Sequence, residues 1–293
     1  MRTIASPEEL RRALAPLRQD SIALVPTMGC LHEGHISLIR KAKRLADVVV
    51  VSIYVNPLQF GANEDFSRYP RTLAQDAQIC ADEGVNFIFN PSNLYAASGA
   101  QITLTVHSDM SDLLCGAARP GHFDGVATVV NILFNIVQPN IAIFGEKDWQ
   151  QLAILRRMVA DLHIPITIMA APLVREPSGL AWSSRNRYLS DTERQQALHL
   201  YQTLRLMQQL AAAGQSIDTT LEQGRQALAT QQITPQYLEI RQQQSLRPSQ
   251  AKPSSEDRIF IAATIGQTRL IDNMPLLPHP SKINMNTNTE NLA

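Results

Sequence analysis

The sequence predicts an α/β fold, a doubly wound parallel sheet, with a smaller α+β domain after it. Continuous apolar segments such as 21–26 and 47–55 alternate with helical patterns up to about residue 175. Strands of a parallel sheet are buried on both faces, so they appear in a sequence as unbroken apolar runs. Beyond that point, long helices are followed by short strands, which is typical of an α+β domain.

The first domain is expected to span residues 1–175. It begins with a helix-start signal, in which Ser6 can cap the helix, Pro7 suits its first turn and Glu9 can reach back to the cap. Apolar runs and periodicity then predict strands at 21–26, 47–55, 85–90, 140–145 and 166–174, and helices at 35–45, 72–83, 123–137 and 148–162. A further strand is predicted at 102–107, without an assigned place in the sheet.

The second domain is expected to span residues 176–280. Residues 190–193, Ser-Asp-Thr-Glu, repeat the capping-box pattern before a long helix that ends near residue 212. The remaining predicted elements are a helix at 217–230, strands at 236–241, 258–264 and 268–272, and an exposed loop at 247–257. Residues 281–293 contain few apolar side chains and are predicted to form a disordered tail.

The composition excludes several classes of protein. The chain has 293 residues, with 26 Lys plus Arg balanced by 26 Asp plus Glu, so no global charge favours nucleic acid or an anionic membrane as a partner. No segment approaches the roughly 18 apolar residues of a membrane span, and the N-terminus lacks the apolar region of a signal peptide. Three scattered cysteines, Cys30, Cys80 and Cys115, argue against a disulfide framework. We therefore expect a cytoplasmic location.

Two close histidines, His32 and His35, follow the first apolar strand and precede a predicted helix. They could suggest zinc, but a zinc peptidase helix needs the spacing H-E-x-x-H, whereas this segment reads H-E-G-H and has no recognisable third ligand. A helix N-terminus at the carboxyl end of a strand favours a bound phosphate instead. In the ordinary alternative, one histidine caps the turn and the other is solvated. Spacing alone supports the phosphate role and this alternative equally.

Two further polar segments lie where ligands of such folds bind. In "FGEKDWQQL" (144–152), Gly145 permits close approach to the backbone, and Lys147 stands beside a helix N-terminus, where the helix dipole disfavours a cation unless an anion is bound. Asp148 could cap the helix or accept from ribose hydroxyls, and Gln151 lies one turn further in. The third segment supplies hydroxyls and a forked cation suited to a polyphosphate, although most such loops are simply solvated: Ser183, Ser184 and Arg185.

Neutral amides follow the second buried strand. Asn56 and Gln59 lie at the same expected edge of the sheet, and Pro57 stiffens the turn between them. Amides suit the hydroxyls and carboxylate of a small substrate. Arg119 and His122, in a glycine-containing loop before a helix, receive no assigned role.

Together these segments closely resemble the pantothenate synthetase (pantoate–β-alanine ligase) family. The motifs occur in the family's order over residues 1–275: "PTMGCLHEGHISLIR", "VSIYVNPLQFG", "DFSRYPRTL", "RPGHFDGVATVV", "FGEKDWQQL", "VREPSGLAWSSRNRYLS" and "GQTRLIDN". The resemblance implies a Rossmann-like, HUP-type fold of the HxGH nucleotidylyltransferase superfamily, with the Ser-Ser-Arg loop in place of the KMSKS loop of class I aminoacyl-tRNA synthetases.

The resemblance also implies an activity. Pantoate would attack the α-phosphorus of ATP, which carries Mg²⁺ on its phosphates, to give pantoyl adenylate and pyrophosphate. β-Alanine would then displace AMP to give pantothenate, a step of coenzyme A biosynthesis. No metal site made by the protein itself is expected, and the family implies a homodimer.

The resemblance also implies which residues act. The implied catalytic residues are His32, His35, Lys147, Ser184 and Arg185, with His35 as proton donor. Gln59 and Gln151, with Asn56 nearby, would hold pantoate or β-alanine. The residues implied at the ATP site are Met28, Gly29, Cys30, Leu31, His32, Glu33, Gly34, His35, Gly145, Glu146, Lys147, Asp148, Val174, Trp182, Ser183, Ser184 and Arg185.

Two positions depart from the family pattern, and two other functions stay open. Cys30 stands where Ala or Asn is expected, and Trp182 replaces a smaller apolar residue, often Met or Leu. One alternative is an HxGH nucleotidyltransferase that stops at a nucleotidyl product, although the pair Gln59 and Gln151 favours a polar acid substrate. The other is a nucleotide-sensing module that binds ATP without releasing pyrophosphate, since a fold alone does not give function.

Overall fold

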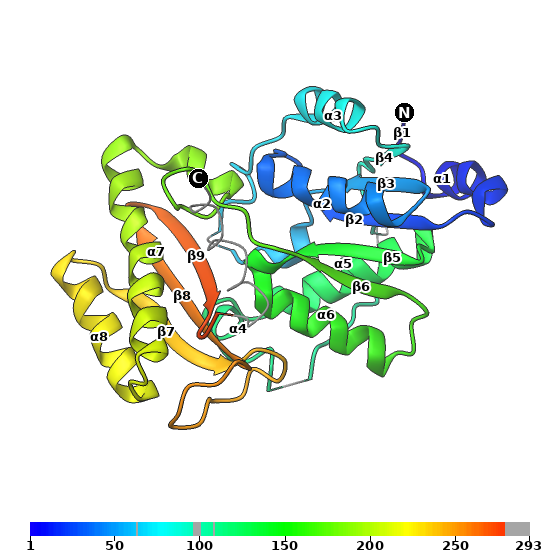
Figure 1. Ribbon diagram of the computed structural model, residues 1–293. Coiled ribbons are helices and arrows are strands. Elements are labelled where there is room, and N and C mark those ends of the chain that lie inside the picture. The colour runs from blue at the N-terminus through cyan, green and yellow to red at the C-terminus, as the bar shows by residue number, and fades with distance from the viewer. Residues whose placement is uncertain (63, 96–100, 108, 279–293) are drawn as a thin grey trace, which may run out of the picture. The chain divides into compact units, whose positions relative to one another are not determined.

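The chain folds into two compact units that divide after Arg187 (Figure 1). The structure, a computed structural model, describes residues 1–62, 64–95, 101–107 and 109–278. The division falls at 187/188 rather than at the expected 175/176. Residues that follow 175 remain attached to the first unit: Arg175 pairs with Ala181 in an isolated bridge, and Arg185 forms hydrogen bonds with Asp65.

The first unit contains a six-stranded parallel sheet in the order β1-β4-β3-β2-β5-β6. Its strands are β1 Arg2–Ile4, β2 Ile22–Thr27, β3 Val48–Ile53, β4 Phe87–Phe89, β5 Ile141–Gly145 and β6 Thr167–Ala171. The chain builds outward from β2 through β3 to β4, and then returns to place β5 on the other side of β2. Between β2 and β5 the winding direction reverses, which is where open α/β sheets bind ligands. The predicted fold class is confirmed.

Helices cover both faces of this sheet (Figure 1). The first unit has helices α1 Pro7–Leu14, α2 Glu33–Leu45, α3 Leu73–Asp82, α4 Cys115–Ala118, α5 His122–Val137 and α6 Trp149–Asp161. Helices α2 and α3 share a core with alternate residues of the strands, such as Val49 and Val51. Helix α5 packs against both α1 and α6, and α5 and α6 also contact strands of the sheet. Val50, which points opposite to its neighbours, is also fully buried, so the unbroken apolar runs do reflect burial on both faces.

The strand predicted at 102–107 is wrong. In the structure residues 101–107 have no regular secondary structure. The backbone N–H groups of Leu104 and Val106 donate to side chains of α5, to Thr128 Oγ1 at 2.9 Å and Asp124 Oδ1 at 2.8 Å. These two acceptors lie one turn apart on the helix. The backbone N–H groups of this alternating segment therefore bond to helix side chains instead of to a neighbouring strand. Conversely, β1 was missed, since only Ile4 of its three residues is buried.

The second unit has an antiparallel sheet and two long helices. Its helices are α7 Asp191–Ala212 and α8 Ile217–Thr230, and its strands, paired in the order β7-β8-β9, are β7 Pro235–Gln242, β8 Asp257–Ile265 and β9 Thr268–Pro275. Ser190 and Glu193 form both halves of the predicted capping box. The predicted tail at 281–293 lies outside the described residues. Among the helices that the structure describes, none is long and apolar enough to cross a membrane.

Candidate active site

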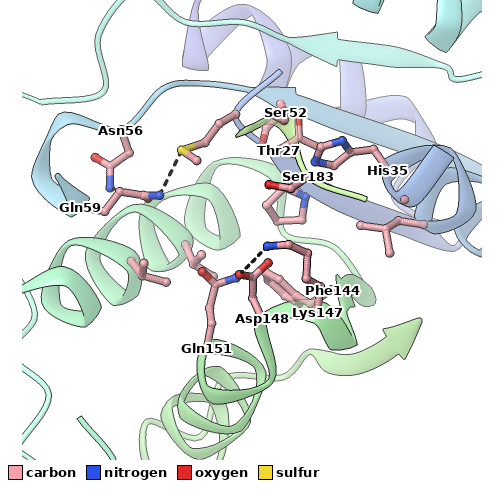
Figure 2. A pocket seen from close by; sticks show the side chains of 18 of the residues that line it. Thr27, His35, Ser52, Asn56, Gln59, Phe144, Lys147, Asp148, Gln151 and Ser183 are labelled. Atoms are coloured by element: carbon pink, nitrogen blue, oxygen red, sulfur yellow. Dashed lines mark hydrogen bonds and ion pairs between the residues drawn. The ribbon is translucent and has the colours of Figure 1, made fainter. Parts of the chain in front are cut away.

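A cavity of about 220 Å³ opens at the carboxyl edge of the parallel sheet, where β2 and β5 diverge. Residues from the ends of β2, β3 and β5 line it, together with the segments that follow them and the first turns of α5 (Figure 2). Figure 2 shows Asn56 and Gln59 on one side of this cavity and His35 on another, while Lys147, Asp148 and Gln151 rise from the start of α6. The cavity thus stands at the switch point of the sheet, as the fold predicts.

The turn from β2 into α2 is held by a buried carboxylate. Gly29 and Cys30 have φ values of 80° and 52°, so two successive residues adopt the left-handed conformation. Asp76 of α3, only 1% exposed, accepts hydrogen bonds from the backbone N–H of Cys30 at 3.0 Å and of Leu31 at 2.8 Å. Asp76 therefore fixes the turn that delivers the histidines. Sequence reasoning missed it, because its partners lie some 45 residues away.

His32 is the N-cap of α2, and its ring has one defined tautomer. Nδ1 accepts a hydrogen bond from the backbone N–H of Gly34 at 3.1 Å, so the neutral ring carries its proton on Nε2. Burial of the ring lowers the pKa of His32 to about 2, with further contributions from His35 and Lys147. A Cβ on Gly34 would lie 2.8 Å from the ring of His32. Glycine is therefore required for this contact, and His32 presents an N–H donor at neutral pH.

His35 lies directly against His32 and is incompletely bonded. The two rings are 4.1 Å apart between centroids. Nδ1 of His35 is buried and has no hydrogen-bond partner among the described residues. Burial, followed by the charge of Lys147, lowers the pKa of His35 to about 4, so this ring is also neutral at pH 7. The indole of Trp182 stacks on His32 at 5.7 Å between centroids and 17° between planes.

Glu33, which made the sequence suggest a metal, is turned away from the cavity. It is exposed, and its carboxylate lies 3.9 Å from the guanidinium of Arg40. Among the described residues, no group of three or more His, Cys, Asp and Glu side chains could hold a metal ion. Glu33 therefore does not join His32 and His35 at the cavity.

The segment after β5 brings a cation to the same space. Lys147 lies in a short 3-10 helix, Glu146–Asp148, and its Nζ is 3.5 Å from Asp148 Oδ1. Gln151 follows on α6, and all three side chains of Lys147, Asp148 and Gln151 line the cavity. Lys147, a cation placed beside a helix N-terminus where the helix dipole disfavours it, therefore lies at the cavity wall.

The loop that carries the two serines is tied to the turn after β2. Ser184 Oγ donates to the backbone oxygen of Cys30 at 3.3 Å. Arg185 donates from Nε and Nη2 to both oxygens of Asp65, at 3.0 and 2.7 Å, and its guanidinium lies 5.8 Å from the centre of the Tyr69 ring. Arg185 thus reaches the cavity wall already paired with a carboxylate. Asp65 is a second residue that sequence reasoning missed.

The amide side of the cavity is more completely bonded. Asn56 is 1% exposed and donates from Nδ2 to Gln59 Oε1 at 3.1 Å and to the backbone oxygen of Gly125 at 3.0 Å. Its Oδ1 accepts from the hydroxyl of Tyr95 at 2.5 Å. Gln59 Nε2 contacts Met28 Sδ at 3.1 Å. Sulfur is a weak acceptor, so Gln59 Nε2 is the group on this side that a better acceptor could recruit, whereas Asn56 is committed to orienting it.

Most of the residues expected at the two substrate sites line this one cavity. Those that do are Met28, His32, Gly34, His35, Asn56, Gln59, Gly145, Lys147, Asp148, Gln151, Val174, Trp182, Ser183, Ser184 and Arg185. Five expected residues do not line it: Gly29, Cys30, Leu31, Glu33 and Glu146. The first three shape the turn before α2. Arg119 and His122, which have no role assigned from the sequence, line the cavity beside Gln59.

The sequence pattern of the family described as Pantoate-beta-alanine ligase matches residues 2–275 of this chain. The chain belongs to the pantoate–β-alanine ligase family. It is 51% identical over 278 residues to a pantothenate synthetase of Chromohalobacter salexigens, covering 94% of this chain and 98% of that protein. This membership confirms the predicted family and the predicted ligase activity.

Solved structures of the family share the whole fold. A pantothenate synthetase of Thermus thermophilus superposes with a TM-score of 0.90 at 43% identity, covering 95% of this chain and all of that one. A pantoate-beta-alanine ligase of Francisella tularensis, complexed with Beta-gamma ATP and Beta-alanine, superposes with a TM-score of 0.80 at 37% identity, covering 94% and 98%. The sheet topology described above is thus that of the family.

Proposed function

We propose that this cavity is the active site of an ATP-dependent ligase that joins pantoate to β-alanine through a pantoyl adenylate. The observation that carries the proposal is the convergence of three groups on one cavity at the switch point: the pair His32 and His35, the cation Lys147, and the amides of Gln59 and Gln151. Family membership of the chain supports the same reaction.

In the first step, a carboxylate oxygen of pantoate attacks the α-phosphorus of ATP. The bond from that phosphorus to the bridging oxygen breaks, and pyrophosphate leaves with the bridging oxygen. Because a carboxylate is already ionised, this step needs alignment and stabilisation of negative charge rather than a strong base. Nε2–H of His32 and the ammonium group of Lys147 are donors suited to the phosphate oxygens. The start of α2 adds backbone N–H groups and the positive end of the helix dipole.

His35 is proposed to donate a proton as pyrophosphate leaves. In the free protein its ring is neutral, because burial and Lys147 lower its pKa to about 4. Bound phosphates would reverse the second effect by adding negative charge beside the ring. The buried Nδ1 of His35, which has no partner in the described part of the chain, supports a role that is completed only when a ligand arrives.

Pantoate would lie against the amides of Gln59 and Gln151, which face the cavity from opposite sides (Figure 2). In the second step the amine of β-alanine attacks the acyl carbon of the adenylate. The bond from that carbon to the phosphate oxygen breaks, AMP leaves with the oxygen, and the attacking nitrogen loses one proton. No nucleophilic side chain is required for either step.

Three expectations accompany this proposal. Mg²⁺ would be carried by the ATP phosphates, since this ion keeps several waters and binds through one or two carboxylates with substrate phosphates. Asp148, which lines the cavity beside Lys147, is a carboxylate that fits such an arrangement. The ligase would act as a homodimer, a form that the family resemblance suggests. The free, buried thiols of Cys30 and Cys80 support a reducing, cytoplasmic location.

The proposal is tested by measuring pyrophosphate, AMP and pantothenate while each substrate is omitted in turn. We expect pyrophosphate release to need ATP and pantoate, and AMP release to need β-alanine as well. Release of a free nucleotidyl product without the amine would instead indicate the nucleotidyltransferase alternative. ATP binding with no pyrophosphate release under any condition would indicate a sensing module.

A further inference from the structure

Arg119 and His122 converge on the main-chain carbonyl of Gln59. Arg119 donates to this oxygen from Nη2 at 3.0 Å, and His122 reaches it from Nδ1 at 2.8 Å. The same two side chains contact each other, since Arg119 Nη1 lies 3.0 Å from His122 Nε2. The carbonyl of one residue at the amide side of the cavity is therefore held by two side chains, one from the residue that ends α4 and one from the first residue of α5.

Each atom of this network has a defined role. Because Arg119 can only donate, His122 Nε2 must accept from it, and Nδ1 must carry the proton that is given to Gln59. Burial, followed by the charge of Arg119, lowers the pKa of His122 to about 4, which agrees with a neutral ring in this tautomer. Glu64 completes the network by accepting from Arg119 Nε at 2.7 Å and from Nη2 at 2.5 Å.

These bonds leave Arg119 poorly suited to hold a substrate carboxylate, although it lines the cavity. Its Nε, Nη1 and Nη2 all have protein partners, and the pair with Glu64 is the forked, charge-assisted geometry that is strongest for arginine. These bonds use four of its five N–H groups, so Arg119 could bind a carboxylate through two N–H groups only by giving up a bond to Glu64, Gln59 or His122. The network is therefore better described as a support than as a second anion site.

The support acts on a segment that has little freedom elsewhere. Residues 57–59 form a short 3-10 helix against α5, where a Cβ on Gly125 would lie 2.3 Å from the backbone oxygen of Leu58. At its other end, Asn56 holds the side-chain oxygen of Gln59 at 3.1 Å. The direction of the Gln59 amide therefore depends on the anchoring of its own carbonyl.

We infer that Glu64, Arg119 and His122 are positioning residues, which fix the main chain of Gln59 so that its amide faces the acid substrate. The inference rests on the proposed function, in which Gln59 binds pantoate. It assigns a role to the motif "RPGHFDG", which the reaction steps above do not use.

Two isosteric variants of His122 separate positioning from general stability. His122→Asn can place an amide donor near the position of Nδ1 and so keep the bond to Gln59. His122→Gln can place its amide near Nε2 and keep contact with Arg119, but it has no donor near Nδ1. We expect His122→Gln to raise the KM for pantoate roughly five- to tenfold, as for the loss of one hydrogen bond, with little change in the KM for ATP. His122→Asn should have the lower pantoate KM of the two.

Arg119→Lys provides a second test of the positioning role if either histidine variant fails to fold. Lysine keeps the charge but cannot form a fork with Glu64 while reaching Gln59 and His122. It should raise the pantoate KM and leave the ATP KM near that of the wild type. Arg157→Lys is the matched control, because Arg157 lies on the exposed face of α6, where it pairs with Asp161.

The outcomes are distinguishable. Equal pantoate KM values for the two histidine variants, or parallel rises in the KM values for pantoate and ATP, would overturn the positioning role. Pyrophosphate release by the wild-type protein that does not depend on pantoate would instead overturn the proposed function.

Discussion

Two helix starts face the same cavity with the same kind of side chain and differ in how completely that side chain is bonded. At the start of α2, His35 has a buried Nδ1 without a partner among the described residues. At the start of α5, both ring nitrogens of His122 are bonded, to Arg119 and to the carbonyl of Gln59. In both rings the pKa falls to about 4, mainly through burial. Titration behaviour alone therefore does not distinguish them.

The two helix starts thus differ in whether their polar groups are prepared for a ligand. A buried polar atom left without a hydrogen bond costs about 1–3 kcal/mol, and a ligand that supplies the missing bond removes that cost. The α2 start leaves such a group at the cavity, next to the cation Lys147. At the α5 start, by contrast, the bonds are already made, so its residues hold neighbouring atoms in place. We expect substitutions at the α2 start to affect chemistry and those at the α5 start to affect binding geometry.

Lys147→Ala should give the largest effect. The ammonium group would stabilise charge on the phosphates, and loss of one such group at a preorganised site typically lowers the rate about 10²- to 10³-fold. Single-turnover formation of pyrophosphate from ATP and pantoate measures this step without β-alanine. Arg156→Ala, which removes an exposed cation from α6, is the control. A normal rate of pyrophosphate formation in Lys147→Ala would remove Lys147 from the phosphate site.

His35→Ala should follow, with turnover lowered about 10²-fold or more and a pantoate KM close to that of the wild type. This is the reverse of the pattern expected for His122→Gln, so the two variants measured side by side test the comparison directly. Thermal unfolding checks that the fold of His35→Ala is intact. If turnover stayed near normal, His35 would not be the proton donor, and the lack of a partner for its Nδ1 among the described residues would need another explanation.

Local signals predicted most elements of the fold but not their arrangement. The strands β2 and β3 were evident because runs such as residues 48–53 are buried on both faces. The order of strands, with β5 returning beside β2, depends on contacts between distant segments. The error at 102–107 has the same origin: its alternation is real, but its partners are helix side chains such as Asp124. In β1, two of three residues are exposed, so hydrophobicity carried no signal.

The candidate site was predictable where its residues follow strands directly. His32, Lys147 and Gln59 each stand a few residues beyond a buried strand, so their meeting at one edge follows from the topology. Their supporting residues were not predictable, because Asp76, Glu64 and Asp65 act across separations of 45, 55 and 120 residues, respectively. An acidic residue in a polar loop or on a helix gives no sign of which backbone or guanidinium it holds.

Protein stability should depend on pH through His35 and His122 to a similar extent. His35 and His122 have folded-state pKa values near 4, below the usual value of 6.5 that applies on unfolding. Between these values the unfolded chain binds more protons, so the free energy of unfolding rises with pH and is lost as pH falls from about 6.5 toward 4, by at most about 1.4 kcal/mol per pH unit for each group. Urea unfolding at pH 7 and pH 5 measures this loss.

Removal of either titrating ring tests whether that ring causes the pH dependence. His35→Asn and His122→Asn should each reduce the pH dependence of the urea midpoint, to a similar extent, although only the first abolishes proton donation. A pH dependence unchanged by both substitutions would show that these two rings do not titrate as described, and that other groups cause the acid sensitivity.

Trp182→Leu should give the smallest effect. The indole stacks on His32, on the α2 side of the cavity, and such ring pairs are worth about 0.5–1.5 kcal/mol beyond their buried area. Leucine is the kind of smaller apolar side chain that the family resemblance leads us to expect here, so we expect the KM for ATP to change about two- to tenfold while the pantoate KM stays constant. Leu206→Met, a change to a half-buried apolar residue of the second unit, is the control. A shift in the pantoate KM instead would mean that Trp182 acts on the amide side, and the division of the cavity between the two helix starts would then fail.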